Sequence, residues 1–222
     1  MMFILVGCLS AEDTGFESPF VEDLPELMSV PSWRSTEWGY ATGGGRADFD
    51  RDGWVDLVVS YGNDMDQGSL AIYFNHENGL STEADWFSER EGYYAHLSVG
   101  DVNGDGWPDV VVSRFLGAER FDSPGGIEVY LNQRGEFLSS PDWEFSGLFT
   151  FSNALGDVDQ DGDLDLAVAV GEPYFNAPQR SCVFENDGFG HYGLAPIWES
   201  EISHTLDVAW GDRNGDKLLD LL

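Results

Sequence analysis

A nine-residue acidic pattern occurs four times in this chain of 222 residues, and it limits the possible folds more than any other feature. Aspartate occupies its first, fifth and ninth positions, and aspartate or asparagine occupies the third. The copies span residues 48–56, 101–109, 157–165 and 212–220, so they begin 53, 56 and 55 residues apart. A fixed period of this length indicates a repeat architecture in which each unit is one supersecondary structure.

The segments between the acidic loops repeat as well. Each complete loop is followed by two short runs rich in β-branched and aromatic residues and bounded by Gly, Asn or Asp, which is typical of strands. A tryptophan precedes every loop by 14 or 15 residues, and the four are Trp33, Trp86, Trp143 and Trp198. With about four short strands in each unit, the pattern predicts an all-β fold, a β-propeller of four-stranded blades over residues 31–222. It contains three complete repeats and part of a fourth.

The acidic loops have the composition of a metal site. Side chains at positions one, three, five and nine converge if the backbone curls, and position seven adds its carbonyl, which is the logic of a shortened EF-hand loop. All donors are oxygens, so Ca²⁺ is favoured, whereas zinc prefers His or Cys. We therefore predict up to four Ca²⁺ ions, one in each loop. The predicted ligands are Asp48, Asp50, Asp52, Trp54 and Asp56; Asp101, Asn103, Asp105, Trp107 and Asp109; Asp157, Asp159, Asp161, Asp163 and Asp165; and Asp212, Asn214, Asp216, Leu218 and Asp220.

The sixth position of each loop must turn sharply. Gly53, Gly106 and Gly162 occupy it in the first three loops, where glycine accepts a positive φ without strain. Lys217 stands there in the fourth loop, and a non-glycine residue in that conformation costs about 1–2 kcal/mol. The fourth loop is therefore the weakest predicted site. The alternative, solvated Asp-Gly turns without metal, accounts poorly for carboxylates crowded together in four copies.

The net charge excludes some partners. The chain has 41 Asp and Glu against 10 Lys and Arg, a formal charge of −31. Nucleic acid and anionic membrane surfaces are not expected partners, because both require clustered basic residues.

The N-terminal sequence MMFILVGCLS resembles a bacterial lipoprotein signal, in which Cys8 would carry the lipid. It lacks a cationic start and its apolar run is short, so a plain apolar terminus is the alternative. Residues 1–8 are interpreted as this signal and residues 9–30 as an acidic tether. We expect an exported protein of the cell envelope or surface, or an extracellular one, that contacts a membrane only through Cys8. Cys182 is expected to be a small buried hydrophobe rather than part of a disulfide framework.

The segments GDVNGDGWPDVVVS, GDVDQDGDLDLAVAV and VAWGDRNGDKLLDL resemble the FG-GAP/VCBS repeat family, the calcium-binding propeller blades found in integrin α subunits. The resemblance implies an extracellular binding or adhesion platform, usually seven-bladed. Because a propeller closes with about 4–8 blades, we expect this chain to be a truncated reading frame or a fragment.

The sequence favours a binding module over an enzyme. The four histidines are scattered, without an HExxH motif or a partner Ser or Cys arrangement, and are expected at the surface or at strand edges: His76, His96, His191 and His204. The leading hypothesis is a surface-exposed propeller that binds a protein or glycan, with Ca²⁺ in a structural role. The alternatives are an accessory module of a secreted polysaccharide-acting enzyme and a structural spacer.

Overall fold

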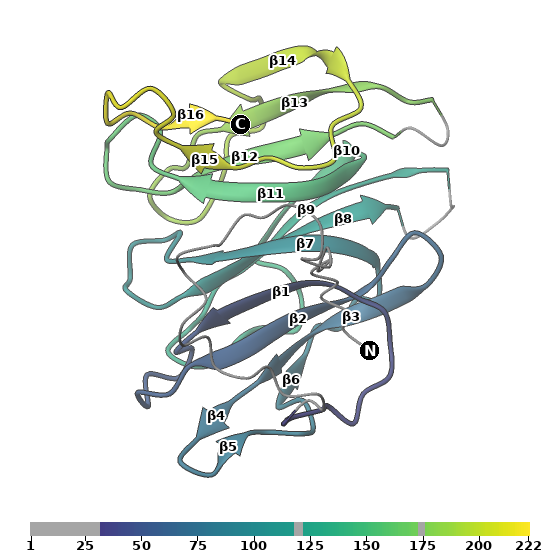
Figure 1. Ribbon diagram of the computed structural model, residues 1–222, viewed down its shortest axis with the longest axis vertical. Helices are drawn as coiled ribbons and strands as arrows, with labels where there is room; N and C mark the ends of the chain where they lie inside the picture. Colours follow the sequence, from purple (N-terminus) through teal and green to yellow (C-terminus); the bar gives the residue numbers. More distant parts are fainter. Residues whose placement is uncertain (1–31, 118–121, 173–175) are drawn as a thin grey trace, which may run out of the picture.

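The computed structural model describes residues 32–117, 122–172 and 176–222, which form antiparallel β-sheets (Figure 1). The predicted signal, the tether and Cys8 lie outside these residues. Blade one has the strand order β1-β2-β3-β6. Its strands are β1 (Ala41–Ala47), β2 (Asp56–Gly62), β3 (Gln67–Tyr73) and β6 (Trp86–Phe87), with a small hairpin of β4 (Asn75–His76) and β5 (Gly79–Leu80) after β3.

The next two units repeat this topology. Blade two consists of β7 (Tyr93–Gly100), β8 (Asp109–Leu116), β9 (Pro124–Tyr130) and β10 (Trp143–Leu148). Blade three consists of β11 (Thr150–Gly156), β12 (Asp165–Val170), β13 (Gln179–Phe184) and β14 (Trp198–Ser203). A two-stranded sheet follows, with β15 (Trp210–Gly211) and β16 (Asp220–Leu221). The prediction of an all-β propeller with four-stranded blades is confirmed. Among the described residues, no helix is long and apolar enough to cross a membrane.

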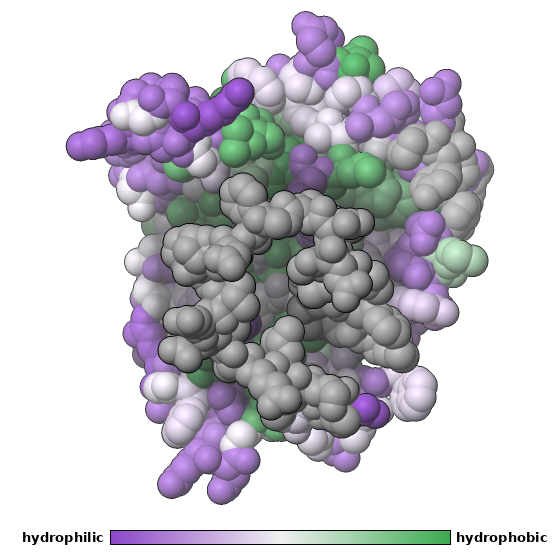
Figure 2. All heavy atoms as spheres, in the orientation of Figure 1, coloured by the Kyte–Doolittle hydropathy of each residue, from purple (hydrophilic) through white to green (hydrophobic). Residues whose placement is uncertain are grey.

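Each acidic loop closes the hairpin between the first two strands of its unit. The pairs that flank the loops are Ala47↔Asp56, Gly100↔Asp109, Gly156↔Asp165 and Gly211↔Asp220. The first strands β1, β7, β11 and β15 lie side by side, so the four loops project from the same edge, at the left of Figure 1. Hydrophilic residues dominate this edge on the face shown in Figure 2.

The core lies between neighbouring blades because the central strands are buried on both sides. In β8, Val110 and Val112 belong to the cluster shared with blade one, whereas Val111 belongs to the cluster shared with blade three. Alternate residues of a strand point to opposite faces, so a run of consecutive valines supplies both interfaces. Cys182 lies in the second of these clusters with 3% of its surface exposed, as predicted, and burial raises the pKa of its thiol to about 12.

The recurring tryptophans join one blade to the next. Trp86, on the outer strand of blade one, packs edge-on against Tyr130 of blade two and donates its Nε1–H to the Phe137 carbonyl at 3.1 Å. Trp33 makes the equivalent contact on blade one, since its ring packs edge-on against Tyr73 and its Nε1–H reaches the Leu80 carbonyl at 3.1 Å. The segment around Trp33 therefore packs on blade one in the way that the outer strand of blade one packs on blade two.

A fully buried carboxylate organises the middle of blade two. Glu128 on β9 accepts the hydroxyl protons of Tyr94 and Tyr130, both at 2.9 Å. Arg90 Nη1 lies 2.5 Å from the other carboxylate oxygen, and Arg114 Nε lies 3.2 Å from that oxygen as an ion pair without hydrogen-bond geometry. Burial and the nearby Glu128 charge raise the pKa of both tyrosines, so their hydroxyls remain donors.

Candidate metal-binding loops

All predicted ligand residues lie in the four hairpin loops or, for the ninth position, at the first residue of the following strand. In loop one, carboxylate oxygens of Asp48, Asp50 and Asp56 lie within 4.8 Å of one another. In loop three, Asp157, Asp159 and Asp161 do the same. Loops two and four have asparagine at the third position, and no three carboxylates come as close there among the described residues.

The loops are curled by hydrogen bonds from their backbone to their own carboxylates. The first aspartate accepts the N–H of position six: Gly53 to Asp48 at 3.0 Å, Gly106 to Asp101 at 2.7 Å and Lys217 to Asp212 at 2.9 Å. The fifth aspartate accepts the N–H of position seven in all four loops, at 2.8–3.2 Å. These Asx-type turns bring the acidic side chains onto the inner side of each curl.

The ninth aspartate has a structural role that the acidic pattern alone does not reveal. Asp109 is fully buried, and its two oxygens accept the backbone N–H groups of Val102 at 2.9 Å and Asn132 at 2.7 Å. Asp56 and Asp165 are held in the same way. Each carboxylate oxygen has a second lone pair, so these contacts leave the predicted role as ligand possible.

An asparagine connects neighbouring loops. Asn132 donates its Nδ2–H to the carbonyl of Phe49 in loop one at 2.8 Å, and Asn186 donates to Val102 in loop two at 2.7 Å. The recurring asparagine is visible in the sequence, since it ends the second apolar run in every complete repeat. The sequence does not show that the hydrogen-bond partner of Asn132 or Asn186 lies in the preceding blade. Arg51 of loop one adds a second connection, because it donates to the Gly106 carbonyl and its guanidinium lies 4.3 Å from the centre of the Trp107 ring.

The electrostatics of the loops fit a cation. Burial, and then the nearby Asp105 and Asp101 charges, raise the pKa of Asp109 to about 7. Burial and the neighbouring Asp161 and Asp165 carboxylates raise the pKa of Asp163 to about 6. A cation within a few ångströms reverses such shifts, because it favours the ionised form.

Unpartnered oxygens point to the same conclusion. Asp48 Oδ1 and Asp157 Oδ1 are buried and accept no hydrogen bond. A buried carboxylate oxygen without a partner costs free energy, and a metal ion is one partner that removes the cost. The residues present therefore fit an oxygen-coordinated cation such as Ca²⁺, best in loops one and three.

The backbone of the sixth position is left-handed in every loop. Gly53, Gly106 and Gly162 have φ values of 94°, 86° and 101°, and Lys217 has 71°. Lys217→Gly is expected to raise the free energy of unfolding by about 1 kcal/mol, since glycine adopts this conformation without the Cβ clash. Urea unfolding would measure the change. Lys217→Ala is the control, because alanine keeps the Cβ and should give no such gain. A lower stability of the glycine variant would contradict the prediction.

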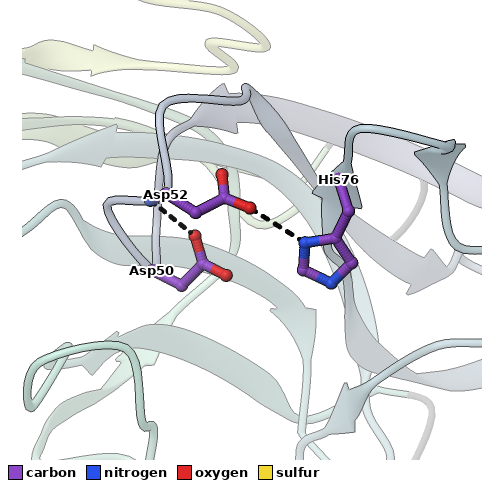
Figure 3. A group of neighbouring side chains, drawn as sticks. All are labelled: Asp50, Asp52 and His76. Atoms are coloured by element: carbon purple, nitrogen blue, oxygen red, sulfur yellow. Dashed lines mark hydrogen bonds and ion pairs between the residues drawn. The ribbon is translucent and has the colours of Figure 1, made fainter.

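One residue near loop one was not expected from the sequence. His76 on β4 follows Asn75, and its Nδ1 lies 2.9 Å from Asp52 Oδ2 (Figure 3). Asp50, Asp52 and His76 form a second group whose ligand atoms lie within 4.8 Å. The surface position predicted for His76 is confirmed, but its proximity to the loop depends on the β4–β5 hairpin, which the acidic pattern does not specify.

A polar group also lies on the inner strands. His96 and Ser152 come from β7 and β11, and with Asp207 they line a hollow of about 360 Å³. Ser152 Oγ donates to Asp207 Oδ1 at 2.5 Å, whereas His96 Nδ1 is 3.9 Å from that same oxygen. The serine therefore contacts the aspartate and not the histidine, which differs from the order that nucleophilic catalysis requires.

The comparisons with known proteins agree with this architecture. Residues 48–112 and 157–222, more than half of the chain, match the FG-GAP-like repeat. The chain is 40% identical to human integrin alpha-7 over 89 residues, which is 37% of the chain and 7% of that protein. It is 29% identical to chicken integrin alpha-6 over 162 residues, covering 67% and 14%. Bovine phosphatidylinositol-glycan-specific phospholipase D is 28% identical over 149 residues, covering 58% and 18%.

The chain thus spans less than a fifth of the length of each of these relatives. Among solved structures, the rhamnogalacturonan lyase of Bacillus licheniformis superposes with a TM-score of 0.51 at 15% identity, over 82% of this chain and 39% of the lyase. This likeness concerns the fold. The repeat match, the strand order and the recurring acidic loops lead to one assignment: the chain belongs to the FG-GAP repeat family.

Proposed function

We propose that this chain is an extracellular binding module whose propeller blades are stabilised by Ca²⁺ and whose partner is a protein or a glycan. The observation that carries the proposal is the same acidic curl, placed four times along one edge of the blades. The similarity to integrin alpha chains supports a role in binding. Export, and a lipid on Cys8, belong to the same proposal.

Calcium would act on the hairpin in each unit. Asp48, Asp50, Asp52 and Asp56 would hold the ion in loop one, and the equivalent residues would hold it in the other loops. The bound ion supplies the positive charge that lets the carboxylates stay ionised side by side. Because the ninth aspartate also holds the first residues of its loop and the end of the third strand, filling the loop would stiffen the whole unit.

Thermal unfolding tests the role of calcium. At a Ca²⁺ concentration 100 times the dissociation constant, each occupied site adds about 2.7 kcal/mol, which raises the melting temperature by roughly 5–10 °C. The measurement compares metal-depleted protein with protein in excess Ca²⁺ and in excess Mg²⁺. Mg²⁺ should stabilise less, because it requires a tighter octahedron. Equal melting temperatures in all three conditions would contradict the proposal.

No catalysis is part of the proposal. The likeness to a polysaccharide lyase is one of fold, so an accessory role in polysaccharide degradation is the second candidate rather than the first. Incubation of the purified chain with pectic polysaccharides separates the two. Release of reducing ends would replace the proposed function with an enzymatic one, and binding without cleavage would identify the glycan partner.

A further inference from the structure

Loop one differs from the other acidic loops because an imidazole lies against it. Two groups of three ligand residues meet there and share Asp50. The inner group, Asp48, Asp50 and Asp56, is all oxygen and includes a buried aspartate. The outer group, Asp50, Asp52 and His76, combines two carboxylates with a nitrogen and faces solvent (Figure 3).

The geometry of the outer group suits a small transition-metal ion. Ligand atoms at about 2.0–2.2 Å from a metal lie about 3.3–3.6 Å apart at the tetrahedral angle that zinc prefers. His76 Nδ1 and Asp52 Oδ2 are 2.9 Å apart as a hydrogen-bonded pair, so a small increase in their separation would admit the ion. The other oxygen of Asp52 accepts the N–H of Trp54 at 2.8 Å, which fixes the carboxylate so that Oδ2 faces the imidazole.

The chemistry of the donors differs from that of the inner group. Ca²⁺ takes oxygen ligands, whereas mixed imidazole and carboxylate sets suit Zn²⁺ and its neighbours in the first transition series. The buried, unpartnered Asp48 Oδ1 is an independent sign that loop one is built around positive charge. The two positions share carboxylates, but Asp48 belongs only to the inner group and His76 only to the outer group, so substitutions of these two residues act on one position each.

The other blades do not provide this arrangement. The residue that follows the recurring asparagine is His76 in blade one, Gln133 in blade two and Asp187 in blade three. His191 of blade three does pair with an aspartate, since its Nδ1 is 3.2 Å from Asp187 Oδ2, but no third ligand lies within reach among the described residues. Its side chain is 53% exposed and that of His76 is 55% exposed, so the two histidines are matched in accessibility.

We propose that Asp50, Asp52 and His76 form a second cation site on loop one that takes a borderline divalent ion of the Zn²⁺ class, beside the all-oxygen position. Three protein ligands at an exposed site leave at least one coordination position open to water or to a donor from another molecule. This site shares Asp50 and Asp52 with the calcium ligands proposed for loop one and goes beyond them by a nitrogen ligand, His76, that is not part of the acidic loop.

Zinc titration of the full chain tests the proposal. Cys8→Ser is used as the background so that the Cys8 thiol does not compete for zinc, and titrations are run on metal-depleted protein and in excess Ca²⁺. Imidazole nitrogen NMR resolves the four histidines, and Zn²⁺ should shift the His76 resonance in both conditions. His76→Gln, which introduces the residue of blade two, should weaken zinc binding at least about tenfold. His191→Gln should leave zinc binding unchanged.

Each outcome decides the question. Equal zinc affinity of the His76→Gln variant and the parent would overturn the proposal, and so would an equal loss in His191→Gln. A shift of His76 only without Ca²⁺, together with Ca²⁺ release on zinc addition, would show a single shared position and overturn the second site. Asp48→Asn should reduce Ca²⁺ stabilisation while leaving the zinc response of His76, so failure of the calcium role and failure of the zinc site are distinguishable.

Discussion

Glu128→Ala is expected to lower the free energy of unfolding by about 3–5 kcal/mol, because it leaves a buried Arg114 without its counter-charge. Two tyrosine hydroxyls, from Tyr94 and Tyr130, lose their acceptor at the same time. Urea unfolding at saturating Ca²⁺ measures the loss without contribution from the acidic loops.

Glu144→Ala is the matched control for this prediction. Glu144 also pairs with Arg90, at 2.6 Å, but its side chain is 46% exposed, so its removal should cost less than about 1 kcal/mol. Glu128→Gln keeps the volume of the side chain and removes its charge. Its loss in the free energy of unfolding should lie between those of Glu128→Ala and Glu144→Ala. Equal costs for Glu128→Ala and Glu144→Ala would mean that the buried network contributes no more than a surface ion pair.

Asp109→Ala is expected to cost about 2–6 kcal/mol even without calcium, because the backbone N–H groups of Val102 and Asn132 lose their acceptor inside the core, at about 1–3 kcal/mol each. Denaturant unfolding of metal-depleted protein measures this loss.

Asp105→Ala, in the same loop, provides the comparison. Asp105 is exposed, and its removal from metal-depleted protein should change stability by about 0.5 kcal/mol or less, as at most surface sites. In excess Ca²⁺ the same variant should lose the stabilisation that loop two contributes. If the two alanine variants were equally stable without metal, the ninth aspartate would have no structural role apart from its predicted part as a ligand.

The strand pattern could be predicted because each unit repeats the same local signals. The apolar runs after the loops, such as 109–116, are buried on both faces and became the second strands of the blades. Residues with an obvious local role, such as Gly53 and Lys217, were also placed correctly, since a left-handed backbone is required by the loop itself.

The contacts that cross blade boundaries could not be predicted in this way. Asn132 and Phe49 are 83 residues apart, and nothing local to either residue identifies the other as its partner. His76 approaches Asp52 only because a two-residue hairpin follows β3, and the acidic pattern carries no information about that hairpin. The metal chemistry of the loops follows from their composition, whereas the identity of their neighbours follows from the stacking of the blades.

The position of Trp33 has a consequence for how such a chain can lengthen or shorten. The sequence repeat runs from one tryptophan to the next, whereas a blade ends with the tryptophan that packs on its successor. The sequence repeat therefore begins one strand before the structural blade begins. A tandem duplication that begins anywhere within a repeat still supplies a tryptophan to every interface that it creates. A truncation that begins at the first strand of blade one, in contrast, removes Trp33 and leaves Tyr73 without the aromatic ring that packs on it.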